Sequence, residues 1–125
     1  MNRILTTGLL AAATLLAGTA HAAEPPLKIG LIGPFSGPSY ESGGAAFEQG
    51  IKTFLKIHGD TVAGRKVEII RRDVPEPMPE LAKRMATELV VRDKVDFLTG
   101  VIFTPNALAV GQVSGATKTP FVIMN

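Results

Sequence analysis

The chain has 125 residues, and its 13 Lys and Arg nearly balance its 11 Asp and Glu, for a formal net charge of +2. No long run of one charge sign occurs, which excludes a basic patch for nucleic acid or an anionic membrane surface. The chain contains no cysteine, which excludes disulfides, cysteine-based metal sites and lipid attachment to a cysteine. The domain must therefore fold on burial alone or belong to something larger.

Residues 1–22 have the pattern of a secretory signal peptide. One arginine precedes a mainly apolar stretch over 4–16, and Ala20 and Ala22 place small residues at both ends of a cleavage signal. The apolar stretch is about 13 residues long, short of the roughly 20 that span a bilayer, which favours a cleaved signal over a membrane anchor. We therefore expect export to the periplasm and a mature domain over 23–125.

The first strand expected is residues 27–33, a mostly apolar run of strand length that ends before a proline. A stretch rich in glycine and proline follows over 34–44. From Ala45 to His58 the apolar residues recur at helical spacing, with a stripe formed by Phe47, Ile51, Phe54, Leu55 and His58. Gly59 is placed to end this helix.

Alternating residues predict a second strand over 66–71, and three prolines within 73–79 exclude a regular element there. A second helix begins at Pro79, where the fixed φ of proline suits the first turn. The later elements expected are a strand over 95–99, a loop over 100–105, a weaker helix of small residues over 106–117 and a strand over 121–124.

This β-α-β-α-β-α-β order predicts an α/β fold with a doubly wound parallel sheet, right-handed crossovers and strand order 2-1-3-4. Ligands of such sheets bind outside the carboxyl ends of the strands, where the winding reverses. The reversal here is expected between the first and third strands, flanked by the loops over 34–44 and 100–106. Both loops lead into helix N-termini, whose N–H groups and positive dipole end suit a carboxylate.

The sequence offers no catalytic or cofactor machinery. Gly30, Gly33 and Gly37 do not have the G-x-G-x-x-G spacing of a dinucleotide site, and Ser36 stands one place late for a nucleophile elbow. His58 is the only histidine after the signal peptide, and its place on the helix stripe favours packing or capping. We expect no enzyme, no cofactor and no metal site.

Charged residues around the second strand have ordinary explanations. Asp73, Glu76 and Glu80 fit a solvated loop followed by a helix N-terminus. Arg71 and Arg72 fit an exposed strand end better than an anion site.

Thr104 is the strongest candidate for contact with a ligand. It follows the third strand, where its hydroxyl and the N–H groups of Asn106 and Ala107 would converge on an anionic group. The alternative is a threonine that merely caps a helix. Phe103 beside it is either an aromatic of the binding face or a packed loop anchor.

Residues 28–38, KIGLIGPFSGP, closely resemble the opening strand and loop of type I periplasmic binding proteins of the leucine/isoleucine/valine-binding family. The glycine pair before the first helix matches as well. Further matches in register occur at GRKVE (64–68), DFLTG (96–100) and KTPFVIMN (118–125). The resemblance covers essentially all of residues 27–125. It implies solute capture between two α/β lobes and delivery to the membrane subunits of an ABC importer. Because such proteins run to several hundred residues, 23–125 is expected to be a partial N-terminal lobe.

By this resemblance, Thr104 falls where the family places a serine or threonine that grips the ligand carboxylate. Ser42 falls where leucine-type binders often carry a tyrosine that packs on the ligand, so it departs from the branched-chain pattern. Residues 103–107 with 124–125 look more like members assigned to aromatic or other organic acids. The expected ligand is therefore a small carboxylate, either an amino acid or an aromatic or other organic acid. The expected ligand-binding residues are Thr104, Phe103, Asn106, Ser42, Phe35 and Asn125.

Two alternatives from other classes stay open. One is the periplasmic ligand-sensing domain of a receptor, which a downstream transmembrane segment would distinguish. The other is a small stand-alone enzyme or regulator of flavodoxin-like topology. A receiver domain of that topology would need carboxylates at the end of the first strand, where Gly33 and Pro34 stand, and would carry no export signal.

Overall fold

A computed structural model describes residues 24–124; the expected signal peptide and Asn125 lie outside the described residues. Within 24–124 the chain forms five strands, three α-helices and one short π-helix. In chain order these are β1 (Leu27–Gly33), η1 (Tyr40–Gly44), α1 (Ala45–His58), β2 (Thr61–Val62), β3 (Arg65–Asp73), α2 (Pro79–Val91), β4 (Phe97–Gly100), α3 (Thr104–Thr117) and β5 (Phe121–Ile123).

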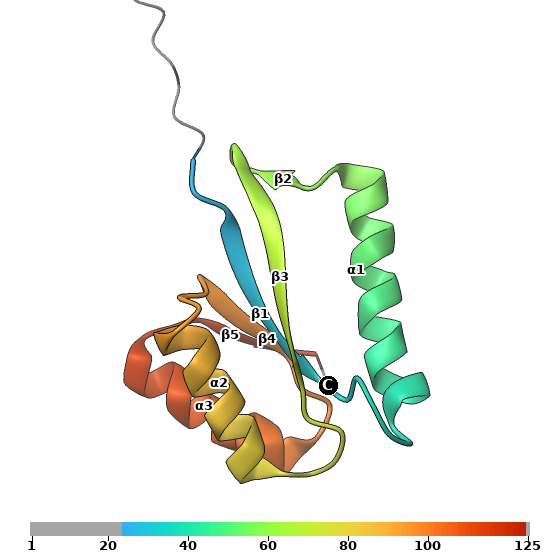
Figure 1. The fold of residues 1–125 in the computed structure, drawn as a ribbon, viewed down its shortest axis with the longest axis vertical. Helices are drawn as coiled ribbons and strands as arrows, with labels where there is room; N and C mark the ends of the chain where they lie inside the picture. Colours follow the sequence, from blue (N-terminus) through green and yellow to red (C-terminus); the bar gives the residue numbers. More distant parts are fainter. Residues whose placement is uncertain (1–23, 125) are drawn as a thin grey trace, which may run out of the picture.

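The strands form one sheet in the order β2-β3-β1-β4-β5 (Figure 1). β1 pairs in parallel with both β3 and β4, and β4 pairs in parallel with β5. The doubly wound sheet and its predicted order 2-1-3-4 are therefore confirmed, since the four expected strands are β1, β3, β4 and β5. β2 was not predicted; it pairs antiparallel with β3 through a tight turn in which Ala63 and Gly64 have φ of 49° and 81°.

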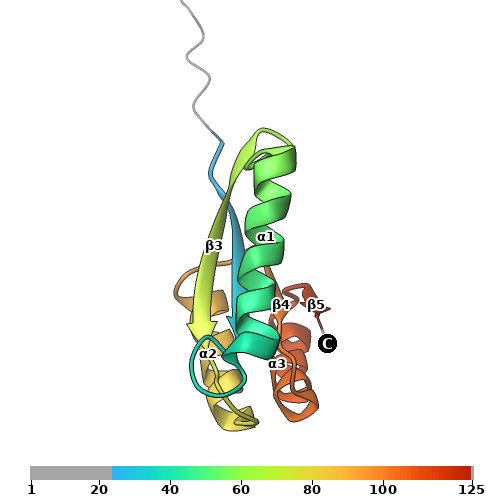
Figure 2. The same cartoon turned by 90° about the vertical axis from the view of Figure 1, so that its right-hand side faces the viewer.

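The helices lie on both faces of the sheet. α1 covers one face alone, and α2 and α3 lie side by side on the other (Figures 1 and 2). The chain moves from β1 to β3 in one direction and from β3 past β1 to β4 in the other. Right-handed crossovers in opposite directions place their helices on opposite faces, which explains the arrangement.

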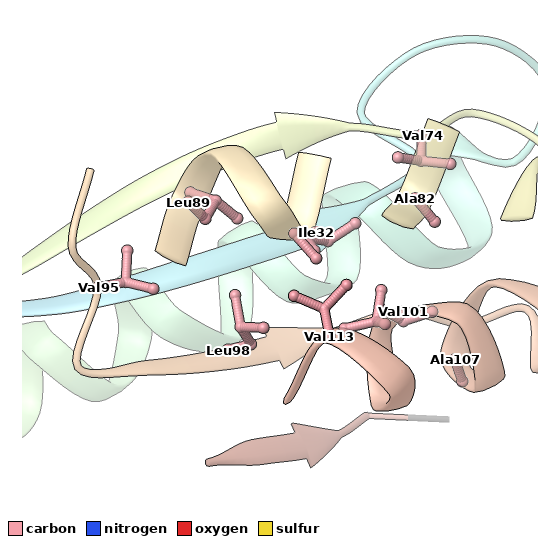
Figure 3. Packing of buried hydrophobic residues seen from close by; sticks show 11 residues of the cluster. Ile32, Val74, Ala82, Leu89, Val95, Leu98, Val101, Ala107 and Val113 are labelled. Carbon is pink, nitrogen blue, oxygen red and sulfur yellow. The ribbon is translucent and has the colours of Figure 1, made fainter. Parts of the chain in front are cut away.

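The main core lies between the sheet and the pair α2 and α3. Ile32 of β1 and Leu98 of β4 point toward Leu89 of α2 and Val113 of α3 (Figure 3). Gly30 makes room for this packing, because a Cβ there would lie 2.9 Å from Leu98 and 3.0 Å from Leu89. The cluster of buried residues consists of Ile32, Val74, Ala82, Ala86, Leu89, Val95, Leu98, Val101, Ala107, Val110 and Val113.

The face under α1 is covered much less. Of the predicted apolar stripe only Phe47 is buried, and Phe54 keeps 57% of its surface exposed. His58, at the end of α1, stacks on Phe54 with ring centroids 4.5 Å apart. An open apolar groove of about 480 Å³ runs between α1 and the sheet. The stripe was thus correctly placed on a helix, but most of it stays half-buried or exposed, because α1 covers this face of the sheet alone.

None of the helices within 24–124 is both long and apolar enough to cross a membrane.

Candidate functional site

The ends of β1 and β4 lie side by side at the carboxyl edge of the sheet, where Ile32 pairs with Gly100. The segment 34–44, which includes η1, leaves β1 here, and residues 101–103 lead from β4 to α3. The two segments touch, since a Cβ on Gly43 would lie only 2.8 Å from the Ile102 side chain. The structure therefore brings together the two loops that the winding reversal singled out.

The turn after β4 has an unusual backbone. Gly100 and Val101 have φ of 101° and 66°, and the Val101 N–H donates a 2.7 Å hydrogen bond to the Ile32 carbonyl. A positive φ is costly for a β-branched residue and marks a conformation held by its surroundings, often at a binding site. The turn ends the pairing of β4 and allows α3 to begin three residues later.

Thr104 is the first residue of α3, and it is exposed. The helix begins two residues earlier than predicted, and the capping position belongs to Phe103, with an extended backbone. The interpretation of Thr104 as a helix cap is therefore wrong. The Ala107 N–H donates to the Phe103 carbonyl at 2.9 Å, so the expectation that it would face a ligand is also wrong. The N–H groups of the first turn, at Thr104 and Asn106, precede the first intrahelical donor and are the ones left for a ligand.

The Asn106 side chain faces the protein interior. It is only 2% exposed, and its Nδ2 donates a 2.9 Å hydrogen bond to the Glu76 carbonyl. Its Oδ1 is buried and has no hydrogen-bond partner among residues 24–124. Through this contact Asn106 ties the connection between β3 and α2 to the start of α3, and its backbone N–H is the group on the site side.

The other predicted site residues occupy the two loops. Ser42 is exposed in η1, and its hydroxyl donates to the Ser39 carbonyl at 3.3 Å. Phe35 is half-buried against Gly33, and Phe103 is half-buried before α3. Asn125 lies outside the described residues.

A group of charged residues beside the first loop was missed from the sequence. Asp73, expected in a solvated loop, accepts hydrogen bonds from the Phe35 N–H at 2.8 Å and from the Ser36 hydroxyl. Arg71 forms an ion pair with Glu48 of α1. Both residues are exposed near the end of β3, as expected for Arg71, whereas Asp73 is the last residue of the strand and not part of a loop. The contacts of both side chains with the loop that follows β1 were not predicted.

Asp96 is a carboxylate at the opposite edge of the sheet. The backbone N–H of Lys28 donates to it at 2.8 Å, and Arg65 pairs with it at 2.9 Å. These contacts, the backbone hydrogen bond first, hold the pKa of Asp96 below its ordinary value. Arg65 also donates to the carbonyls of Pro25 and Pro26 at 2.9 and 2.8 Å. This cluster fastens the start of the domain and lies away from the candidate site.

No group of three or more His, Asp or Glu side chains within 24–124 is arranged to hold a metal ion.

Comparison with known proteins places this geometry in a family. Residues 26–124 match the family described as periplasmic binding protein. The Leu/Ile/Val-binding protein homolog 6 of Brucella abortus is 41% identical over 125 residues, which is the whole chain but 31% of the relative. The chain thus spans about a third of the length of the curated relatives it matches.

Solved structures of binding proteins also resemble this chain. A solute binding protein of an ABC transporter from Rhodopseudomonas palustris HaA2, in complex with p-hydroxybenzoic acid, is 42% identical with a TM-score of 0.76, over 82% of this chain and 27% of that one. A leucine binding protein from Thermotoga maritima is 26% identical with a TM-score of 0.69, over 78% of this chain and 27% of that one. These matches confirm the resemblance drawn from residues 28–38. The chain belongs to the periplasmic binding protein family.

Proposed function

We propose that this chain is the first part of an exported solute-binding protein that captures a small organic carboxylate and delivers it to an ABC importer. In this proposal residues 1–22 are the signal peptide, and 23–125 form part of the first lobe in the periplasm. The observation that carries the proposal is the position of Thr104. It is an exposed hydroxyl on the first turn of a 14-residue helix, beside the winding reversal of the sheet.

A carboxylate would meet several donors at this point. The Thr104 hydroxyl and the N–H groups of the first turn of α3 are aligned with the positive end of the helix dipole. Hydrogen bonds to a charged group are shorter and stronger than those between neutral groups. The remainder of the ligand would then lie toward η1, between Phe103 and Ser42, with Phe35 and Asn125 as further predicted contacts.

We further propose that the carboxylate is aromatic. A serine at position 42 leaves open the space that a tyrosine would fill, and so makes room for a planar ring. The relative solved with p-hydroxybenzoic acid is 42% identical to this chain, whereas the leucine binding protein is 26% identical. Among the solved relatives, both observations favour a benzoate-like ligand over a branched-chain amino acid, whereas the curated relative that is 41% identical carries a Leu/Ile/Val-binding name; the binding experiment below decides between the two.

Calorimetry on the full-length gene product tests the site and the ligand class together. We expect p-hydroxybenzoic acid to bind and leucine to bind much more weakly. Thr104→Ala removes a hydrogen bond to a charged group, worth about 1.5–3 kcal/mol, which is about tenfold to a hundredfold or more in dissociation constant.

Thr87→Ala is the matched control, because Thr87 is an exposed threonine of α2 whose hydroxyl bonds to the Lys83 carbonyl. It should leave affinity unchanged. Equal affinity in Thr104→Ala and the wild type would overturn the carboxylate site, and tight leucine binding would overturn the aromatic ligand.

A further inference from the structure

The last residues of β3 present alternate side chains to opposite faces of the sheet. Arg72 turns to the α2 side, where it pairs with Asp93 and lies 3.8 Å from Glu88. Arg71 and Asp73 turn to the α1 side, and both contact the segment that follows β1. Figure 2 shows this segment passing the tip of β3 before it enters η1.

Asp73 holds the beginning of that segment with both carboxylate oxygens. Oδ1 accepts the Phe35 N–H at 2.8 Å, and Oδ2 accepts the Ser36 hydroxyl. The next residue of the chain adds a backbone bond, from the Val74 N–H to the Gly33 carbonyl at 2.9 Å. Two consecutive loop residues are thus fixed to a single strand end.

Arg71 holds the same segment through side chains. Its guanidinium lies 4.8 Å from the centre of the Phe35 ring, in cation–π geometry. It also pairs with Glu48 of α1, whose second oxygen accepts the Tyr40 hydroxyl at 3.4 Å. Phe35 begins the loop and Tyr40 begins η1, so this chain of contacts braces the loop at both ends.

These contacts of Asp73, Arg71 and Glu48 with the loop come from β3 and α1. They use none of the groups at the start of α3 that are assigned to the ligand. The segment between them includes Gly37, whose φ is 73°, and exposed Ser36 and Pro38. Such a segment has little buried surface of its own to hold it in one conformation. Its shape therefore depends on the braces.

We propose that Asp73 and Arg71 are positioning residues, which hold the segment 34–39 and the start of η1 in the ligand-binding conformation before the ligand arrives. This proposal rests on the proposed function, because it assigns that segment to the binding site. The physical gain is that the ligand does not have to order the loop on binding. Apparent affinity falls in proportion to the fraction of molecules in the competent conformation.

The test compares Asp73→Ala with Asp73→Asn in the full-length gene product, with p-hydroxybenzoic acid as the probe. Alanine removes both acceptors, and we expect the association rate and the affinity to fall about tenfold while the dissociation rate stays the same. Asparagine restores one acceptor and can donate to the Ser36 hydroxyl, so it should recover most of the affinity. Ser36→Ala removes one brace and should act in the same direction more weakly, which keeps the test valid if Asp73→Ala folds poorly.

Glu76→Ala is the matched control, because Glu76 is an exposed carboxylate three residues further along, and its hydrogen bond within 24–124 is made by its backbone carbonyl. A lower melting temperature in Asp73→Ala with unchanged affinity would reduce Asp73 to a structural residue and overturn the proposal. So would a faster dissociation rate with an unchanged association rate, since that pattern belongs to a direct ligand contact.

Amide hydrogen exchange without ligand separates this proposal from the proposed function. The Phe35 N–H should exchange faster in Asp73→Ala than in the wild type, because it then keeps only its longer bond to the Gly33 carbonyl, at 3.1 Å. Its exchange should recover in Asp73→Asn. If the wild type binds neither p-hydroxybenzoic acid nor leucine, the proposed function fails, and the exchange result still decides whether Asp73 orders the loop. Unchanged exchange at Phe35 in Asp73→Ala would overturn the positioning role.

Discussion

Gly100→Ala should be among the most damaging single-methyl additions to this chain. Gly100 has φ of 101°, and a Cβ built on it would lie 2.1 Å from the Ile32 carbonyl oxygen and 3.1 Å from the carbonyl carbon. That oxygen is also the acceptor of the Val101 N–H at 2.7 Å. The added methyl group thus meets backbone on the neighbouring strand, which cannot move aside as a flexible side chain would.

The expected cost can be worked out from these contacts. The unfavourable backbone conformation costs an alanine about 1–2 kcal/mol. Moving Gly100 away from Ile32 by about 1 Å breaks the Val101 hydrogen bond, worth about 1 kcal/mol. It also disturbs packing around Val101, where poor fit costs roughly 1–3 kcal/mol. The total of about 3–6 kcal/mol is comparable to the whole stability of a small domain, about 5–15 kcal/mol.

Substitutions at two other glycines separate the cost of backbone strain from the cost of a steric clash. Gly59 has φ of 85° and Gly50 lies inside α1, and a Cβ on either meets no atom within 4 Å in the described part of the chain. Gly59→Ala should cost only the strain, about 1–2 kcal/mol. Gly50→Ala should stabilise α1 by about 0.5–1 kcal/mol.

Urea unfolding followed by far-ultraviolet circular dichroism measures all three variants, since the chain has no Trp and one Tyr. Soluble yield is the second readout if Gly100→Ala does not fold. A loss for Gly100→Ala no larger than that for Gly59→Ala would refute the argument that the carbonyl of β1 leaves no room at this position.

Three further outcomes are expected. N-terminal sequencing of the exported protein should begin at Ala23, and an intact Met1 on cytoplasmic material would contradict the signal peptide. The lowered pKa of Asp96 stabilises the fold above the ordinary carboxyl pKa, and this stabilisation is lost as pH falls through the folded-state value. Acid titration of Asp96→Asn should therefore show a shallower loss of stability below about pH 4, and a curve identical to the wild type would argue against the cluster. The isolated 23–125 chain should bind a hydrophobic dye at the groove between α1 and the sheet, and it should associate through the edge strand β5. It should show no useful affinity for small acids. A monomer that unfolds cooperatively and binds such an acid with micromolar affinity would contradict this prediction.

Much of the fold could be predicted because local signals and tertiary packing agree. The bounds of α1 follow from helical spacing that ends at Gly59, whose φ of 85° no other residue adopts as easily. β2 could not be predicted, since two residues carry no periodicity and its turn requires Ala63 in a conformation that alanine seldom adopts. The exposure of Phe54 was also beyond prediction, because an amphipathic pattern tells which face is apolar but not how much surface covers it.

The candidate site was only partly predictable. The position of Thr104 follows from topology alone, because the carboxyl ends of neighbouring parallel strands meet at the winding reversal. The role of Asp73 did not follow, since its partners Phe35 and Ser36 lie 38 and 37 residues away in sequence. Side-chain direction at the end of β3 decides that contact, and a carboxylate among prolines looks the same in sequence whether it faces solvent or a loop.

At the end of the sheet that carries the candidate site, two glycines let neighbouring backbone segments pack closely against the end of β1 and the residue after it. A Cβ on Gly44 would lie 2.1 Å from the Pro34 carbonyl oxygen, just as one on Gly100 would lie 2.1 Å from that of Ile32. Gly44 brings the start of α1 against Pro34, the residue that follows β1, and Gly100 brings the turn that leads to α3 against Ile32 of β1. The positions of both helix entrances are therefore fixed by backbone packing that tolerates no side chain at either glycine. Exposed side chains at those helix entrances, such as Ser42 and Thr104, can then be substituted without moving the backbone of the sheet and helices. Under the proposed function, such exchanges would be enough to change the ligand, so we expect specificity to follow the residues at the helix entrances and the fold to follow the glycines beneath them.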